Sequence, residues 1–219
     1  MTTFLRFSLR KPLCTVLDPS YTTLRRKSLY NYAGRLGPLM TTYCEYCNTH
    51  PEDSFNRSYH DTRYGFPLTD DNALFERLVL EINQAGLSWI TILKKAENFQ
   101  RAYDGFDLET VAGYGEPERA RLLADAGIIR NRLKVDAAIE NARRIRALYP
   151  EFGSFKGWLD AHHPRSKDEW TRLFKQTFVF TGGEIVNEFL MSSGYLPGAH
   201  DQSCPVHAKV REQNPPWMR

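Results

Sequence analysis

The sequence has few cysteines and no long hydrophobic run. Its 219 residues include four cysteines, too few for a secreted disulfide scaffold, which favours a reducing compartment such as the cytoplasm. Its apolar stretches fall far short of the roughly 20 residues that cross a bilayer, so we expect no membrane association. Hydrophobic residues make up 42% and charged residues 25% of the chain, the composition of a globular protein with one main domain.

The chain also lacks a uniform positive charge. Residues 1–39 hold seven bases and one acid, a net charge of +6, whereas the remainder holds 22 bases and 25 acids, a net charge of −3. A nucleic-acid partner would therefore need a local basic patch. The basic leader over 1–39 indicates either a disordered segment outside the fold, with Met40 as an alternative start, or organelle targeting. We expect the domain over 40–210 and an extended, proline-containing tail over 211–219.

Hydrophobic residues recur at helical spacing from residue 70 onward. Leu74, Leu78 and Ile82 predict a helix that Asp70 or Asp71 caps and Gly86 ends. Residues 47–60, in contrast, form a polar stretch without a hydrophobic period, which we expect to be a loop. The predicted helices span residues 71–85, 88–103, 107–111, 118–125, 131–148, 152–161, 166–177 and 182–193. The fold class is all-α, and the fourth and fifth helices form a hairpin around Gly127.

Cysteine and histidine residues occur near both ends of this helical region. His200 and Cys204 are four residues apart, so one helical turn would direct both side chains to one point. Two further ligands would complete the tetrahedron that Zn²⁺ prefers, and the metal would hold the polar loop in place. The candidates are Cys44, Cys47, His50 and His60, with His207 as a rival at the other end. The alternative is a set of surface thiols and solvated histidines without metal.

One acid lies on an apolar helix face. At 100° per residue, Glu81 falls about 20° from Leu74, so its carboxylate points inward. A buried carboxylate needs a structural partner, such as an arginine or a helix N-terminus, or a ligand. Tyr59 and Trp89 could flank Glu81 and form a slot for a flat, hydrogen-bonding or cationic group. Each ring taken alone would more often belong to the core.

Four segments together resemble the 3-methyladenine DNA glycosylase I family, a zinc-containing branch of the helix-hairpin-helix glycosylases. They are "YHDTRYGFP", "LEINQAGLSWITILKKAENF", "DAGIIRNRLKVDAAIENA" and "GYLPGAHDQSC", and the resemblance runs from about residue 47 to 204. It implies a helical glycosylase domain in which one structural zinc ion joins the N- and C-terminal segments. The family's ligands fall on Cys47, His60, His200 and Cys204, with no counterpart for Cys44 or His50.

The same resemblance implies a function. It is that of a monofunctional DNA-3-methyladenine glycosylase, which flips the alkylated base out of double-stranded DNA and hydrolyses its N-glycosidic bond in base excision repair. Glu81 would recognise the base and stabilise the transition state, and Tyr59 and Trp89 would stack on the base. The hairpin would contact DNA phosphates through Gly127, Arg130, Arg132 and Lys134. We expect a cytoplasmic monomer, associated with the nucleoid if the source is bacterial.

Three departures from the family pattern bear on substrate range. Thr49 and Asn56 stand where tryptophan and tyrosine are common, and "TGGE" at 181–184, with Gly182 and Gly183, replaces a threonine-rich turn. A glycosylase with a different lesion range is therefore one alternative. A DNA-binding protein that has kept the fold without catalysis is another, and a structural zinc protein is a third.

Overall fold

The described part of the chain is entirely helical. The computed structural model describes residues 42–219, and all regular elements there are helices, which confirms the all-α prediction. The predicted leader over 1–39 lies outside the described residues. Within them, no helix is both long and apolar enough to cross a bilayer.

The elements are α1 (Tyr43–Thr49), α2 (Ser54–Thr62), α3 (Asp71–Gln84), α4 (Trp89–Leu93), α5 (Ala96–Ala102), η3 (Asp104–Phe106), α6 (Leu108–Ala112), α7 (Glu116–Ala124), α8 (Arg132–Phe152), α9 (Phe155–His162), α10 (Lys167–Thr177), α11 (Gly183–Ser192), α12 (Pro205–Glu212) and η4 (Pro216–Met218).

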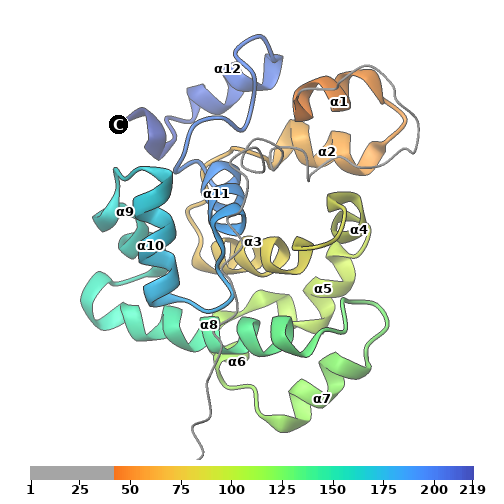
Figure 1. Cartoon of the computed structure of the whole chain (residues 1–219), viewed down its shortest axis with the longest axis vertical. Coiled ribbons are helices and arrows are strands. Elements are labelled where there is room, and N and C mark those ends of the chain that lie inside the picture. The colour runs from red at the N-terminus through yellow and green to blue at the C-terminus, as the bar shows by residue number, and fades with distance from the viewer. Residues whose placement is uncertain (1–41) are drawn as a thin grey trace, which may run out of the picture. The chain divides into compact units, whose positions relative to one another are not determined.

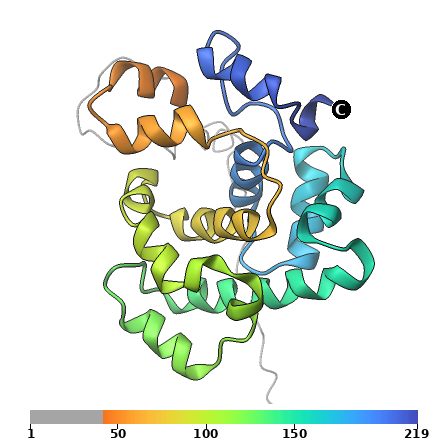
Figure 2. The same cartoon turned by 180° about the vertical axis from the view of Figure 1, so that it is seen from behind.

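Helix α3 lies at the centre of this arrangement. The Asp70 carboxylate caps it by accepting from the Ala73 N–H at 2.7 Å, as the sequence predicts. Leu74, Leu78 and Ile82 are fully buried, since α8 and α11 pack on different sides of α3 (Figures 1 and 2). A core on both sides explains why even the polar residues of this helix are buried.

The predicted helix over 88–103 is two helices. The break between α4 and α5 falls at Lys94 and Lys95. The ammonium group of Lys95 donates to the carbonyl oxygens of Ala126 at 3.1 Å and Gly127 at 2.9 Å. Lys95 therefore holds the turn between α7 and α8.

The polar stretch near the start of the described chain is a pair of short helices, so the prediction of a loop was wrong. The Thr42 hydroxyl caps α1 by accepting from the Glu45 N–H at 3.1 Å, and Asp53 caps α2 by accepting from the Asn56 N–H, also at 3.1 Å. The Tyr43 hydroxyl donates to the Asn56 side-chain oxygen at 3.0 Å and joins the two helices. With 7 and 9 residues, both are too short to show a clear hydrophobic period.

The C-terminal residues are not the predicted extended tail. Helix α12 continues to Glu212, and η4 follows with Pro215 and Pro216 buried. The Trp217 N–H donates to the Gly194 carbonyl at 3.1 Å. These contacts attach the end of the chain to the segment after α11.

Helices α7 and α8 are the two arms of the predicted hairpin, and they pack against each other. A Cβ atom on Gly127, between them, would lie 2.9 Å from an Asp125 carboxylate oxygen and 3.3 Å from the Asn98 Cβ. Glycine is needed here because the neighbours approach closely. The Asn131 side chain caps α8 by accepting from the Lys134 N–H at 3.3 Å.

Candidate functional site

Four buried ligand atoms converge where α1, α2 and the segment before α12 meet. Cys44, His60, His200 and Cys204 form a cluster in which the atoms lie within 4.8 Å of one another. The His60 Nε2 atom lies 3.3 Å from the Cys44 sulphur and 3.7 Å from the Cys204 sulphur. Ligand atoms at zinc–nitrogen and zinc–sulphur bond lengths are separated by about 3.3–3.8 Å in a tetrahedron, so the cluster has the dimensions of a metal site.

The hydrogen bonds around the two histidines indicate what the cluster needs at its centre. His60 Nδ1 lies 2.7 Å from an Asp61 carboxylate oxygen, and His200 Nε2 lies 2.7 Å from the Tyr64 carbonyl oxygen. Each of these nitrogens must carry hydrogen to bond an oxygen, so the other nitrogen of each neutral ring presents a lone pair. Those two nitrogens, His60 Nε2 and His200 Nδ1, are only 3.2 Å apart. A cation between them removes the repulsion, and such outer hydrogen bonds are typical of metal-binding histidines.

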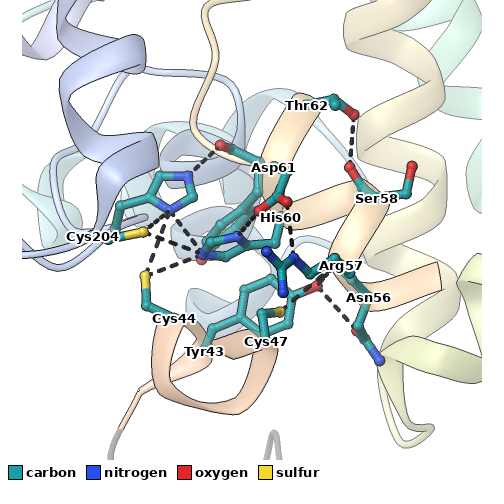
Figure 3. Close-up of polar contacts among 12 residues, drawn as sticks. Tyr43, Cys44, Cys47, Asn56, Arg57, Ser58, His60, Asp61, Thr62 and Cys204 are labelled. Carbon is teal, nitrogen blue, oxygen red and sulfur yellow. Dashed lines mark hydrogen bonds and ion pairs between the residues drawn. The ribbon is translucent and has the colours of Figure 1, made fainter. Parts of the chain in front are cut away.

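The structure corrects one predicted ligand. Cys44, sixteen residues before His60, takes part in the cluster, whereas the predicted Cys47 places its sulphur 3.7 Å from the Asn56 carbonyl oxygen. Figure 3 shows the sulphurs of Cys44 and Cys204 together beside His60 and that of Cys47 apart from them. The two cysteines are nearly one turn apart on α1, so spacing alone could not separate them.

Two other predicted ligands, His200 and Cys204, lie in the cluster but on a different local structure from the one predicted. His200 and Cys204 converge as predicted, but through a turn that includes a hydrogen bond from the Cys204 N–H to the Asp201 carbonyl at 2.9 Å, and not through a helix. The rivals lie outside the cluster: the His50 ring stacks on Tyr46 with centroids 4.4 Å apart, and His207 stacks on Trp217 at 6.1 Å.

Glu81 is buried as predicted, with 4% of its surface exposed. Burial and, after it, the charge of Glu188 raise the pKa of Glu81 to about 8, against the opposing effects of Arg77 and a hydrogen bond from Ser192. Among residues 42–219, Glu81 forms no ion pair. The nearest candidate, the Arg77 guanidinium, donates through Nη1 to the Ser192 carbonyl at 2.9 Å. The structural ion pair considered as an alternative is therefore not found.

Among residues 42–219, three buried donors around the Glu81 site have no partner: Arg77 Nε, the Tyr59 hydroxyl and the Trp89 indole N–H. The Tyr59 and Trp89 rings are 4% and 9% exposed and meet edge to face with centroids 5.0 Å apart. Within residues 42–219, the Tyr59 hydroxyl and the Trp89 indole N–H make no hydrogen bond. Buried polar groups are rarely left unpaired, and such groups need an explanation. A ligand with hydrogen-bond acceptors would satisfy them.

The turn between α7 and α8 exposes part of the predicted basic patch. Arg130 and Arg132 are exposed, and the carbonyl groups of Ala126 and Gly127 are turned to Lys95. Lys134 is different. It is 5% exposed, and its ammonium group donates to the carbonyl oxygens of Asn83 at 2.8 Å and Ala85 at 2.7 Å, at the end of α3.

The prediction that Lys134 contacts phosphates was therefore wrong. Its position in the first turn of α8 is buried against α3, because that turn packs on the C-terminal end of the helix that carries Glu81. Burial lowers the pKa of the Lys134 ammonium group. The two carbonyl oxygens compensate in part for the lost hydration.

A match to a known family covers residues 48–172, and the matching family model is described as methyladenine glycosylase. The chain belongs to the methyladenine glycosylase family. The match includes α2, α3, the turn of the hairpin and all three residues of the Glu81 site, and so agrees with the resemblance found in the sequence.

Curated relatives and solved structures agree with the family. The chain is 48% identical over 179 residues to DNA-3-methyladenine glycosylase 1 of Escherichia coli K12, covering 73% of this chain and 95% of the relative. It is 33% identical over 185 residues to a Haemophilus influenzae DNA-3-methyladenine glycosylase, covering 76% and 98%. It is also similar to the structure of 3-methyladenine DNA glycosylase I from Staphylococcus aureus, with a TM-score of 0.67, 32% identity and coverage of 75% of this chain and 97% of that chain.

The three departures from the family pattern lie in different settings. Asn56 is buried, accepts from the Tyr43 hydroxyl of α1 and donates to the Asp53 carboxylate that caps its own helix, α2, while Thr49 is exposed at the end of α1. Gly182 lies between α10 and α11 on a cavity of about 590 Å³. The lining residues are Lys175, Phe178, Val179, Phe180, Thr181, Gly182 and Ile185. Glu81, Tyr59 and Trp89 do not line this cavity.

Proposed function

We propose that this chain is a monofunctional DNA glycosylase that releases 3-methyladenine from DNA by hydrolysis of the N-glycosidic bond. The family supports this activity, and one solved relative, a single-substitution variant with 31% identity over 73% of this chain and 96% of that chain and a TM-score of 0.66, is a complex with 3-methyladenine. The observation that carries the proposal is a buried Glu81 without an ion-pair partner, beside the unpaired donors of Tyr59 and Trp89.

The chemistry suits this set of groups. Methylation at N3 gives the attached adenine a positive charge and weakens its bond to the sugar, so the base leaves without strong acid catalysis. Glu81 would accept hydrogen bonds from the base edge, and its negative charge would stabilise the developing positive charge of the sugar. Tyr59 and Trp89 would contact the flipped base, and base–aromatic stacking contributes roughly 1 to 3 kcal/mol per base. That gain offsets part of the cost of extruding the nucleotide.

The charge state of Glu81 fits the entry of a cation. With a pKa of about 8, the free carboxyl group is largely protonated at neutral pH, and an arriving positive base would favour the carboxylate. The site would therefore acquire its catalytic charge when the alkylated base is in place. A neutral base would favour the loss of the Glu81 proton less than a cationic base does.

We also propose the hairpin as the contact to double-stranded DNA, with the protein acting as a monomer. Arg130 and Arg132 are exposed near the N-terminus of α8, where side chains and backbone amides could meet phosphates. Gly127 would act by allowing the tight turn that Lys95 holds.

We propose zinc as the metal of the cluster. Two thiolates and two imidazoles at tetrahedral spacing suit Zn²⁺, and four protein ligands leave no open position, which indicates a structural ion. The metal ion would affect base binding only indirectly. His60 follows Tyr59 directly on α2, so an ion that fixes His60 also fixes the ring that would contact the base.

The test is release of 3-methyladenine from methylated duplex DNA. We expect the wild-type protein to release the base and Glu81→Gln to lose about 100-fold or more in rate, because it lacks the charge that stabilises the transition state. Glu184 is an exposed acid on α11, so Glu184→Gln is the matched control and should retain the rate of release. A wild-type protein that binds duplex DNA and releases no base would favour the non-catalytic DNA-binding alternative.

A further inference from the structure

A second acid, Glu188, lies beside the Glu81 site. The Tyr64 hydroxyl donates to its Oε2 atom at 3.1 Å, and the Tyr64 ring lies 5.7 Å from the Tyr59 ring. Glu188 is close enough to act electrostatically on both Glu81 and Tyr59. Neither the helical spacing nor the family resemblance identified this residue.

Helix α11 places Glu188 toward the site. Glu188 and Ser192 are four residues apart and so lie on the same face of the helix. The Ser192 hydroxyl donates to the Phe189 carbonyl at 3.1 Å, close enough to Glu81 to act on its pKa, and the Ser192 carbonyl accepts from Arg77 Nη1 at 2.9 Å. This face of α11 therefore meets α3 at the turn that carries both Arg77 and Glu81.

The charges of this site can be counted. Arg77 contributes one positive charge with 1% of its surface exposed, and Glu81 as a carboxylate contributes one negative charge with 4% exposed. These two charges cancel. Glu188 adds a further negative charge. Burial raises the pKa of Glu188, and the hydrogen bonds from Tyr64 and Asn187 oppose that shift by favouring its carboxylate. The site therefore has a net charge of −1 when both acids are ionised.

The nearest other charged groups do not change this count. Lys167 and Glu184 pair with each other at 3.2 Å, 43% and 80% exposed. Arg63, 45% exposed, pairs with Glu76 at 3.0 Å. Each is a neutral pair with at least one member in solvent, where water and salt weaken its field.

We propose that Glu188 is a specificity-determining residue, which makes the base site net negative and thereby selects positively charged purines over neutral ones. This inference rests on the proposed role of the Glu81 site in binding a purine. Once an arriving cationic base has ionised Glu81, Arg77 would cancel that charge if Glu188 were absent, and the site would distinguish purines by shape and hydrogen bonds alone. Normal DNA bases are neutral, so a net negative charge favours N-alkylated bases as a chemical class.

The test compares two small ligands that differ in one methyl group and one charge. 3,9-Dimethyladeninium is permanently cationic, with a methyl group in place of the sugar, and 9-methyladenine is its neutral counterpart. Calorimetric titration gives a Kd for each, and the ratio of the neutral to the cationic Kd measures charge selectivity. We expect Glu188→Gln to lower this ratio about tenfold, a size set by one charge across a partly buried site, with little change in the Kd of the neutral ligand.

Two further variants separate charge from shape. Glu188→Asp keeps the charge and should keep most of the selectivity, whereas Glu184→Gln, one turn earlier on α11, removes an exposed acid and should leave the ratio unchanged. If Glu188→Gln does not fold, Tyr64→Phe, which removes the hydroxyl that holds Glu188, should lower the ratio in the same direction. An unchanged ratio, or an equal loss of affinity for both ligands, would overturn the proposal.

The two proposals fail in different ways. A wild-type protein that releases no 3-methyladenine but shows a Glu188-dependent ratio would overturn the glycosylase assignment and support the charge selection. A protein that releases 3-methyladenine, but whose Kd ratio does not depend on Glu188, would support the glycosylase assignment and overturn the charge selection. Wild-type protein that binds neither ligand would overturn the charge selection.

Discussion

Glu81 should destabilise the folded protein at neutral and alkaline pH, so its replacement by glutamine should raise stability while it removes activity. Its folded-state pKa is about 8, against an ordinary glutamate value of 4.5. The folded state therefore binds the proton more tightly than the unfolded state. The loss of folding free energy is close to zero below pH 4.5 and grows as pH rises toward 8. Over this range the unfolded chain carries a solvated carboxylate, whereas the folded chain must keep the proton or bury a charge.

The size of the effect follows from the two pKa values. Each unit of difference is 1.36 kcal/mol, so between pH 5 and pH 8 the stability gap between Glu81→Gln and wild type should widen by roughly 3 kcal/mol. For a chain of this length, that free energy corresponds to an increase of about 6–12 °C in Tm of the variant relative to wild type.

The measurement is urea unfolding of both proteins at pH 5, 6, 7 and 8. Other titrating groups contribute to both proteins, so the difference between the two free energies of unfolding isolates Glu81. A difference that stays constant across this range would refute the raised pKa. A difference that shrinks as pH rises would mean that the buried carboxylate has a stabilising partner.

Two further predictions concern the metal cluster and the buried lysine. Cys44→Ala should lose the bound metal and several kcal/mol of stability, whereas Cys47→Ala should retain one metal per chain. Mass spectrometry measures the metal content of each variant, and Tm measures its stability. Metal loss in Cys47→Ala and retention in Cys44→Ala would restore Cys47 as the ligand. Lys134→Met should cost about 1–3 kcal/mol because it leaves two carbonyl groups at the end of α3 without a donor. Its affinity for duplex DNA should change with salt as in the wild type, and a shallower salt slope would return Lys134 to the phosphate contacts.

Much of the fold could be predicted from the sequence because its long helices carry strong periodic signals. Asp70, Asn131 and Ser166 mark three helix starts that the structure confirms, and Glu81 was placed inward from its angle to Leu74. The missed α-helices were α1, α2 and α12. They are short and polar, and they are held by contacts to distant residues that no local pattern reports.

The errors in the site have a similar origin. Cys44 and Cys47 are separated by nearly one helical turn, so the choice depends on how α1 packs against α2, which sequence spacing does not determine. Lys134 belongs to a basic cluster in the sequence, but packing of α8 on α3 buries it. Glu188 gave no signal because its neighbours in the site, Tyr64 after α2 and Glu81 on α3, lie more than a hundred residues earlier.

The cysteine–histidine cluster can assemble only late in the synthesis of this protein. Its first ligands, Cys44 and His60, leave the ribosome well before His200 and Cys204, so the cluster cannot close until nearly the whole chain has emerged. Until then Tyr59, next to His60, lacks the anchor that positions it. A nascent or C-terminally shortened chain would therefore lack the closed cluster, and with it the anchor of the ring that we propose contacts the base.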